Sequence, residues 1–466
     1  MLAVFCVSRC NIRNRGIFNI FAALPMLIPS VSHGMGLIIM FGRNGVLTNF
    51  LDIEIPIYGF WGIVAGSIFY SFSLAYLMLE NILRYEDTSP YEAAEILGIS
   101  RLRQFTSITV PYMRKPLIAV TFAVFTLIAT DYGVPLTVGG RYVTLPVMMY
   151  EEVVGLLNFG SGSVIGAILL IPAAISFILD SFTHNIDNQN YLMHTRSLRM
   201  SSAMNAAARV YCGIVCMIAL LPILSFLILA FVSKYPRDMS FTLHNAANSF
   251  RKGANVYLAN SLTIALCVAV SGVIVSYFAA YLTARSEGAS SRVLHFASIT
   301  SIAIPGIVLG IAYVLLFRTT FLYGTIGILI LVNLVHFFAS PYLMAYNSLN
   351  KVNKNLEAVG MTLGVERWRI LRDVIVPLTA STIVEMWSYF FINSMMTISA
   401  VAFLSNTKIK PLSMMIPSFE ANMQFESAAF VSLLILAANV AMKGLMGTIN
   451  GILRRRNKSY ADSRSI

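Results

Sequence analysis

Long apolar stretches separated by short polar ones dominate the hydrophobic pattern of this 466-residue chain. A membrane-spanning helix needs about 20 mostly apolar residues, and the long runs here do not alternate as the strands of a membrane barrel do. The pattern therefore predicts an all-α polytopic membrane protein with about ten transmembrane helices. We place the spans at residues 17–41, 56–82, 116–138, 160–182, 210–233, 259–284, 293–317, 324–348, 378–403 and 426–450.

One polar segment between spans occurs twice, 266 residues apart. The first copy, YEAAEILGISRLRQFTSITVP, begins at Tyr91, and the second, EAVGMTLGVERWRILRDVIVP, begins at Glu357. Each copy predicts a helix, a sharp turn at a glycine with positive φ, and a second short helix that leads through a proline into the next span. Identical residues in the ungapped alignment are Leu97 and Leu363, Gly98 and Gly364, Arg101 and Arg367, Arg103 and Arg369, Val110 and Val376, and Pro111 and Pro377.

The repeat extends into the flanking spans, because the sequence around Pro29 resembles that around Pro305. A four-helix unit near residues 17–182 then matches the last four helices, and both copies cross the membrane in the same sense. Such a parallel repeat is expected to enclose a path between its halves. We divide the chain into a first unit (1–182), a cytoplasmic linker (183–208), a second unit of six helices (209–453) and a basic tail (454–466).

The first unit lacks a counterpart of the two helices that open the second. The Pro29 register aligns Arg9 with Arg285, which lies inside the end of a spanning helix. We therefore expect that the chain begins in the middle of a helix, and that about 60 to 70 residues, one and a half helices and a loop, are missing from its start.

The formal charge of +12 matters through its distribution. With both repeated segments on one side, 24 of the 33 Lys and Arg residues lie there. The positive-inside rule makes that side, with both termini, cytoplasmic, so the basic charge indicates membrane topology and not a nucleic-acid partner. The nine residues on the other side are Arg43, Arg141, Lys234, Arg237, Arg251, Lys252, Arg318, Lys408 and Lys410.

Composition narrows the function further. The chain is 57% hydrophobic and 12% charged, whereas soluble domains are roughly 25% charged. It contains no G-x-x-x-x-G-K-[ST], HExxH or GxSxG motif, so we expect no catalytic residues, bound nucleotide or metal in this chain. Cys6 with Cys10, and Cys212 with Cys216, have i, i+4 spacing, for which packing as small hydrophobic groups is favoured over a metal site.

The repeated segment resembles the EAA loop of permease subunits of ATP-binding-cassette importers. Glu92, Ala93, Ala94, Gly98 and Pro111 match its E-A-A, glycine and proline. In the second copy the glycine and proline match, but Glu357 lies one residue further from the glycine and Gly360 ends the stretch that replaces E-A-A. The resemblance implies coupling loops that dock on two copies of a cytoplasmic ATP-binding subunit. The implied coupling residues are Glu92, Ala93, Ala94, Gly98, Arg101, Arg103, Pro111, Glu357, Gly360, Gly364, Arg367, Arg369 and Pro377.

DYGVPLTVGG, which begins at Asp131, and the FLSNTKIKPLSMMI segment make the chain similar to the permeases for ferric iron, polyamines, thiamine and phosphonates. This likeness implies import across the bacterial inner membrane of a solute delivered by a periplasmic binding protein. We expect 2-aminoethylphosphonate first and ferric iron next. Polar residues within spans are candidates for the translocation path, with interhelical hydrogen bonding as the open alternative. They are His33, Asp131, His336, Glu385 and Asn393.

Two other classes of function remain to be weighed. A secondary transporter would need no ATPase and predicts inverted repeats or central helices broken by Gly and Pro with paired charges. A membrane scaffold would carry no solute. The parallel repeat, whose best-matched part is a cytoplasmic loop, favours the importer permease over both.

Overall fold

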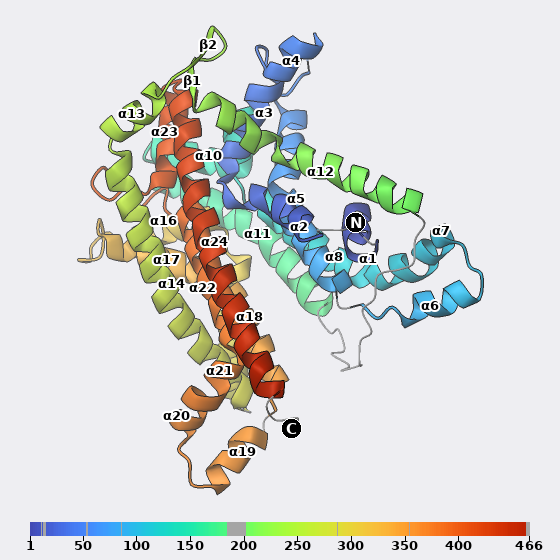
Figure 1. Cartoon of the computed structure of the whole chain (residues 1–466). Coiled ribbons are helices and arrows are strands. Elements are labelled where there is room, and N and C mark those ends of the chain that lie inside the picture. The colour runs from blue at the N-terminus through green and yellow to red at the C-terminus, as the bar shows by residue number, and fades with distance from the viewer. Residues whose placement is uncertain are drawn as a thin grey trace. The chain divides into compact units, whose positions relative to one another are not determined.

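The computed structural model describes residues 1–10, 12, 15–52, 55–84, 86–183, 202–286, 288–353 and 355–462. Helices make up nearly all of this part of the chain (Figure 1). Its two strands, β1 (Val232–Lys234) and β2 (Asp238–Phe241), pair in an antiparallel hairpin. The expected linker falls largely on residues 184–201, which lie outside the described residues, as do the side chains of the expected basic tail.

The chain forms two compact units, each described here by itself. Unit 1 comprises Met1–Glu151 and Ala167–Asn245, and unit 2 comprises Glu152–Gly166 and Ala246–Ile466. The helices that open in unit 1 are α1 (Leu2–Arg9), α2 (Arg15–Ala23), α3 (Ser30–Phe41), α4 (Val46–Leu51), α5 (Phe60–Arg84), α6 (Ser89–Ile96), α7 (Arg101–Gln104), α8 (Val110–Ala129), α9 (Gly133–Val138), α10 (Leu145–Tyr150) and α12 (Ser202–Leu229).

Helix α11 (Phe159–Thr183) begins in unit 2 and continues in unit 1, and α13 (His244–Arg251) begins at the end of unit 1. The remaining helices belong to unit 2. They are α14 (Ala254–Arg285), α15 (Ala289–Thr300), α16 (Gly306–Phe317), α17 (Ile326–His336), α18 (Ala339–Lys351), α19 (Asn355–Thr362), α20 (Arg367–Ile370), α21 (Val376–Leu378), α22 (Ala380–Met396), α23 (Met415–Ala421) and α24 (Phe425–Asp462).

Helix α12, which the repeat assigns to the second half, packs within unit 1 on α1, α2 and α3. At Gly36 of α3 a side chain would come within 2.7 Å of the Pro222 backbone of α12, so only glycine permits this approach. The Cys212 thiol of α12 donates a hydrogen bond to the Ala3 carbonyl oxygen of α1 at 3.7 Å. The compact units and the sequence repeat therefore divide the chain differently.

Among the described residues, six helices are long and apolar enough to cross a membrane, and four bent helix pairs raise this to as many as ten. Two of the bends match each other: α2 and α3 meet at 101° beside Pro29, and α15 and α16 meet at 109° beside Pro305. The prolines that the sequence aligns thus occupy equivalent N-cap positions before α3 and α16. Span 116–138 was placed wrongly, because this helix continues from Arg101 and ends at Ala129.

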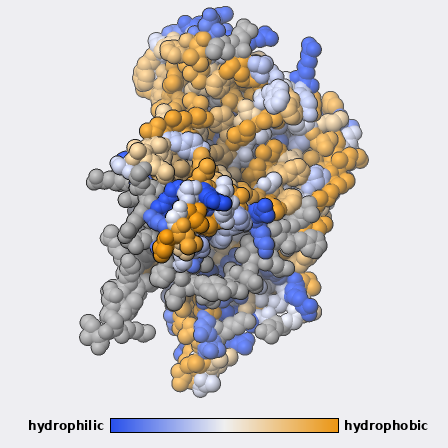
Figure 2. Space-filling view, turned by 90° about the vertical axis from the view of Figure 1, so that its right-hand side faces the viewer, coloured by the Kyte–Doolittle hydropathy of each residue, from blue (hydrophilic) through white to orange (hydrophobic). Residues whose placement is uncertain are grey.

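Hydrophobic residues cover much of the face visible in Figure 2. Helix α11 illustrates the pattern, because its exposed isoleucine and valine side chains recur every three or four residues and so form one stripe. A continuous, exposed apolar stripe on a helix suits contact with lipid. The stripe consists of Val164, Ile168, Ile171, Ile175 and Ile178.

Candidate functional site

The two repeated loops have the same backbone structure residue for residue. In the first, α6 and α7 precede a π-helical segment at Phe105–Thr109, and in the second, α19 and α20 precede one at Leu371–Ile375. Every one of these elements begins and ends 266 residues after its counterpart. Figure 1 shows both as helical hairpins, one formed by α6 and α7 and the other by α19 and α20.

A glycine with positive φ makes the turn in each loop, as the sequence predicts: φ is 68° at Gly98 and 74° at Gly364. The backbone N–H after each glycine donates to the carbonyl oxygen five residues back, Ile99 to Ala94 and Val365 to Gly360, at 3.0 Å in both cases. This pattern closes a helix end and reverses the chain direction. A Cβ at either glycine would meet nothing within 4 Å, so backbone conformation alone demands glycine there.

The tips of both loops are apolar, although the sequence indicated a polar segment. Leu97 and Leu363 each expose 75% of their surface, and the next equivalent pair, Leu102 and Trp368, exposes 77% and 57%. Exposed arginines, Arg103 and Arg369, lie beside them. Large exposed apolar side chains at the tip of a rigid turn are typical of protein docking surfaces.

The E-A-A residues of the first loop divide between surface and interior. Glu92 and Glu95 are exposed, Ala94 is buried, and Ala93 is exposed, so only one of the two alanines packs. Arg101 forms an ion pair with Glu95 at 2.9 Å. Pro111 lies in the first turn of α8, which continues the helix from Arg101 instead of opening a new one.

In the second loop Gly360 takes the place of Ala94. A Cβ there would lie 2.6 Å from Ile370 Cδ1, so the two short helices approach closely. Arg367 Nε lies 3.5 Å from Met361 Sδ, at the position equivalent to Glu95, and Arg369 is exposed. Pro377 lies in α21, ahead of a sharp bend.

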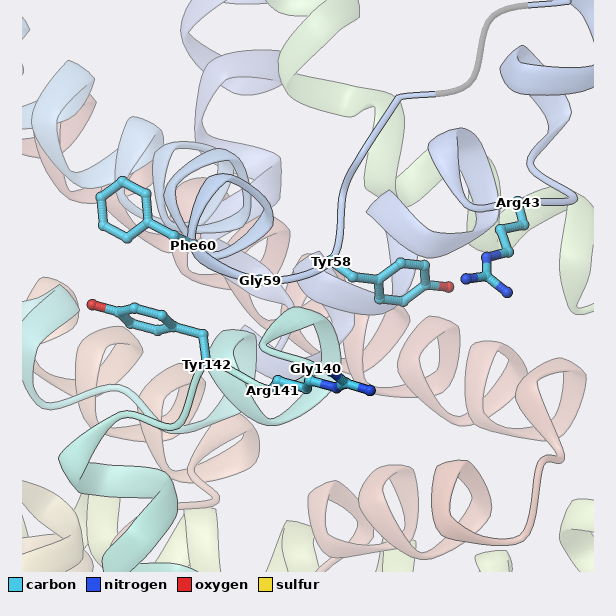
Figure 3. A pocket seen from close by; sticks show the side chains of 7 residues that line it. All are labelled: Arg43, Tyr58, Gly59, Phe60, Gly140, Arg141 and Tyr142. Atoms are coloured by element: carbon cyan, nitrogen blue, oxygen red, sulfur yellow. The ribbon is translucent and has the colours of Figure 1, made fainter.

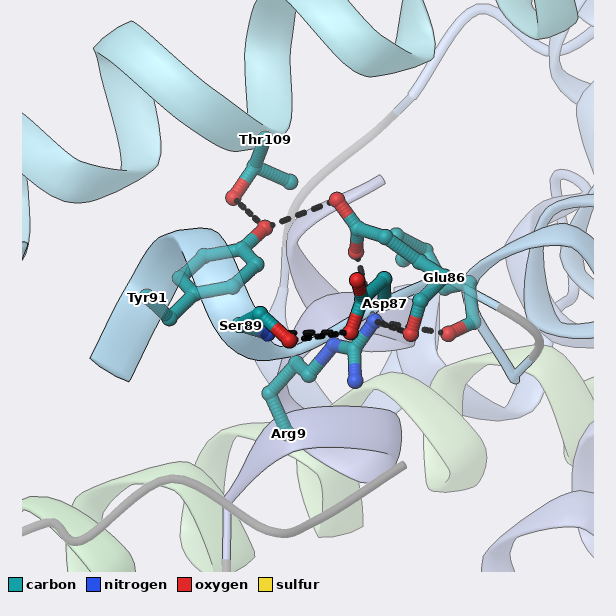
Figure 4. A network of polar contacts seen from close by, with 7 residues as sticks. Arg9, Glu86, Asp87, Ser89, Tyr91 and Thr109 are labelled. Atoms are coloured by element: carbon teal, nitrogen blue, oxygen red, sulfur yellow. Dashed lines mark hydrogen bonds and ion pairs between the residues drawn. The ribbon is translucent and has the colours of Figure 1, made fainter. Parts of the chain in front are cut away.

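A buried polar network anchors the first loop (Figure 4). Arg9 and Glu86, whose side chains are 2% and 4% exposed, form an ion pair at 2.6 Å. Arg9 Nη2 also donates to the Leu83 and Glu86 carbonyl oxygens, and the Tyr91 hydroxyl joins Glu86 Oε1 at 3.0 Å to Thr109 Oγ1 at 2.7 Å. Burial raises the pKa of the Glu86 carboxyl, and its contacts with Arg9 and Tyr91 oppose that shift.

A related network anchors the second loop. Glu357 does not occupy the position of Glu92: it replaces Tyr91 and turns inward, where Oε2 lies 2.9 Å from Arg285 Nε and Oε1 accepts a 2.8 Å hydrogen bond from Tyr281. Arg285 Nη2 donates to the Val352 carbonyl oxygen at 3.1 Å. The sequence alignment placed Arg9 opposite Arg285 but gave no indication of either ion pair.

A pocket of about 680 Å³ lies within unit 1, where the segments around Gly59 and Gly140 meet (Figure 3). Arg43 and Arg141 line it, and neither has a hydrogen bond or ion pair within the described residues. The ring centroids of Phe60 and Tyr142 lie 5.7 Å apart in an edge-to-face arrangement, and Tyr58 also lines the pocket. Two unpaired guanidinium groups beside aromatic rings can bind carboxylate or phosphate groups.

The candidate path residues make the following contacts within their own units. Asp131 accepts backbone hydrogen bonds from Gly133 and Val134 at 3.3 and 3.0 Å, and so caps the short helix α9. Asn393 donates to the Tyr389 carbonyl oxygen of its own helix at 2.8 Å. His33 is buried in α3 and contacts Tyr70. His336 ends α17 where α17 and α18 bend by 50°, and Glu385 is exposed on α22.

The two cysteine pairs come together because α1 packs against α12. The Cys6 thiol lies within hydrogen-bonding reach of Cys10 and Cys212. A second pair beside the first was not expected from the sequence. Even so, no group of three or more His, Cys, Asp or Glu residues in the described part of the chain could hold a metal.

Residues 1–190 and 272–456 match the family of binding-protein-dependent transport system inner membrane components. The chain belongs to this family. The two matched segments fit a fused double permease. Broken helices were one expected sign of a secondary transporter, and the structure contains four bent helix pairs. Membership in a family of binding-protein-dependent transport components nevertheless decides against that alternative. The helices of this chain and its match to a family of inner membrane components confirm the expected all-α polytopic fold. Membership in a family of transport system components also confirms the expectation that the chain is a transport permease and not an enzyme.

Named relatives carry the comparison further. The ferric transport system permease protein FbpB of Actinobacillus pleuropneumoniae is 25% identical over 421 residues, which cover 86% of this chain and 61% of that protein. A Haemophilus influenzae protein whose name assigns it to ferric transport is 26% identical over 416 residues, covering 85% and 66%. The thiamine transport system permease protein ThiP of Brucella abortus is 30% identical over 145 residues, covering 30% and 27%. The chain thus spans 61% and 66% of the two ferric relatives.

Proposed function

We propose that this chain is the membrane-embedded subunit of an ATP-binding-cassette importer, and that its two loops dock on two copies of a cytoplasmic ATP-binding subunit. The exposed leucine at the same place in both loops, Leu97 and Leu363, supports this proposal most directly. A loop that only anchored membrane topology would need positive charge but neither an apolar tip nor a repeated turn glycine. ATP would be bound and hydrolysed by the partner, with both termini of this chain on the same cytoplasmic side.

Ferric iron is the proposed cargo. Two relatives that match 86% and 85% of this chain are named for ferric transport, whereas the thiamine relative matches 30% of it. The expectation of 2-aminoethylphosphonate gains no support from these names and becomes the second candidate. A periplasmic solute-binding protein would deliver the cargo. The pocket of Arg43 and Arg141 is suited to acidic side chains on such a protein, since both arginines fall on the non-cytoplasmic side in the topology expected from charge.

The docking proposal is tested by co-purification and uptake with the full chain, its ATP-binding subunit and its solute-binding protein. Leu97→Asp with Leu363→Asp should abolish co-purification of the ATP-binding subunit and reduce uptake to background, because a carboxylate at the centre of an apolar contact is desolvated without a partner. Phe321→Asp, which also changes a highly exposed apolar residue but outside both loops, is the matched control and should retain both. Retention of the subunit by the double leucine variant would overturn the docking proposal.

The same assay addresses cargo and the outer pocket. Uptake of radiolabelled ferric iron should exceed that of 2-aminoethylphosphonate and thiamine, and equal uptake of all three would remove the iron assignment. Arg43→Glu with Arg141→Glu should lower uptake while the ATP-binding subunit still co-purifies. Uptake unchanged in that variant would exclude the pocket as a contact for the binding protein.

A further inference from the structure

Two buried arginines hold equivalent positions and bind equivalent backbone groups. Arg9 ends α1, and Arg285, its aligned counterpart, ends α14. Arg9 Nη2 donates to the Glu86 carbonyl oxygen and Arg285 Nη2 to the Val352 carbonyl oxygen, both at 3.1 Å. Val352 follows Glu86 by the 266 residues that separate the loops, so the same contact ties each loop to the helix end before it.

The acid that pairs with each arginine comes from a different position. In the first copy it is Glu86, just before α6. In the second, position 352 is a valine and the acid is Glu357, inside α19. The equivalent of Glu357 in the first copy is Tyr91, which bonds to Glu86 instead.

The residues around the paired acid also differ between the two copies. Tyr91 hydroxyl is held by Glu86 and Thr109, whereas the residue equivalent to Thr109 is Ile375, which is buried and needs no hydrogen bond. The hydroxyl of the second copy comes from Tyr281, aligned with Phe5, and reaches Glu357. Each copy therefore supplies an acid and a backbone carbonyl oxygen to the equivalent buried guanidinium, but takes the acid from a different position.

The loops need such an attachment because little else holds their first helices. Helix α19 has no buried residue, and α6 has only Tyr91 and Ala94. A helix with so few buried contacts is free to open or tilt locally. Force applied at the exposed tips, Leu97 and Leu363, would then bend the loop without displacing the helices behind it.

We propose that Arg9 and Arg285 are positioning residues, clamps that make each docking loop move as one body with α1 and α14, and that the paired acid works from either of two interchangeable positions. The inference rests on the proposed function, because the ATP-binding subunit is what would drive the loops. The clamps do not touch ATP or solute. They set how much of the movement at the loop tip reaches the membrane helices.

The test moves the acid of the first copy to its position in the second. The full chain is reconstituted with its ATP-binding subunit and solute-binding protein, and solute uptake per ATP hydrolysed is measured. Glu86→Val should lower this ratio on the order of tenfold while the ATP-binding subunit still co-purifies, because the loop tip is unchanged. Adding the remaining second-copy residues should restore the ratio to within about threefold of the parent chain. These additions are Phe5→Tyr, Tyr91→Glu and Thr109→Ile.

Asp52→Asn, which removes an exposed acid outside both loops, is the control and should leave the ratio unchanged. An unchanged ratio in Glu86→Val, or no recovery in the four-residue variant, would overturn the clamp. If Glu86→Val is not recovered from membranes, Glu357→Gln gives the same readout in the second copy, where the acid is more exposed, and an unchanged ratio there also overturns it. The variant Leu97→Asp with Leu363→Asp distinguishes failure of the clamp from failure of the proposed function. If the proposed function is wrong, that variant still co-purifies with the ATP-binding subunit.

Discussion

The two copies of the repeated loop agree in every helix boundary, but the membrane helices that follow them differ. After the first loop, one helix runs from Arg101 to Ala129, whereas after the second the helices 367–378 and 380–396 meet at 76°. The bend falls at Thr379, whose hydroxyl donates to the Ile375 carbonyl oxygen one turn back and contacts the Tyr277 hydroxyl. Such a bond to the carbonyl of the preceding turn bends helices, and the equivalent residue of the first copy, Met113, cannot form it.

The helices before the loops differ in the same way. Helix α5 is continuous, whereas its counterpart is broken into α17 and α18 with a 50° bend. The two hairpins thus share one geometry, whereas the spans around them differ. Two loops of the same geometry are what the proposed docking on two copies of one partner subunit requires.

Replacing the buried arginines should give the largest loss of stability and the largest difference between the two copies. Arg9→Ala leaves Glu86 buried without its partner, and we expect a loss of about 3–5 kcal/mol in the free energy of unfolding. Arg285→Ala should cost less, because Glu357 is 15% exposed, against 4% for Glu86, and can reach water. Thermal unfolding of the purified complex measures both. Arg103→Ala, at an exposed site, is the control, and an equal shift for Arg9→Ala and Arg103→Ala would contradict the network of Figure 4.

Substitutions at the contact between the two short helices of the second loop should have an intermediate effect on stability. Gly360→Ala places a Cβ 2.6 Å from Ile370 Cδ1, and overpacking of this kind costs about 1–3 kcal/mol. The first copy accommodates Ala94 opposite Gln104, so adding Ile370→Gln should recover much of the loss. Gly444→Ala in α24, where a Cβ meets nothing within 4 Å, is the control and should not destabilise the protein. The melting temperatures of these three variants test the contact, and equal effects at positions 360 and 444 would contradict the close approach of the two helices.

The turn glycines should give the smallest and most similar effects. Gly98→Val and Gly364→Val force a β-branched residue into positive φ, at a cost of about 1–2 kcal/mol each, and should reduce co-purification of the ATP-binding subunit. Gly364→Asn should be better tolerated, because asparagine adopts this conformation more readily. Co-purification that is unchanged in both valine variants would show that the turns do not set the docking geometry.

Local sequence signals predicted much of the fold and part of the site. The lengths of the apolar stretches located most spans, and the repeated glycines, Gly98 and Gly364, predicted both turns. The inward orientation of Glu357 was not predictable, because one residue of displacement on a short helix changes which face a side chain occupies. Nor was the Arg9–Glu86 pair, whose members lie 77 residues apart and carry no local signature of their contact.

The sequence by itself determined that this protein is helical, membrane-embedded and doubled, because apolar length, charge asymmetry and a gapless repeat are properties of the chain alone. Only the tertiary structure decided that α12 packs with α1, α2 and α3, that the loop tips are apolar, and that one buried arginine in each copy takes its acid from a different position. These depend on side chains far apart in sequence that share one low-dielectric space, where a buried guanidinium needs an acidic partner and the two copies place that partner differently.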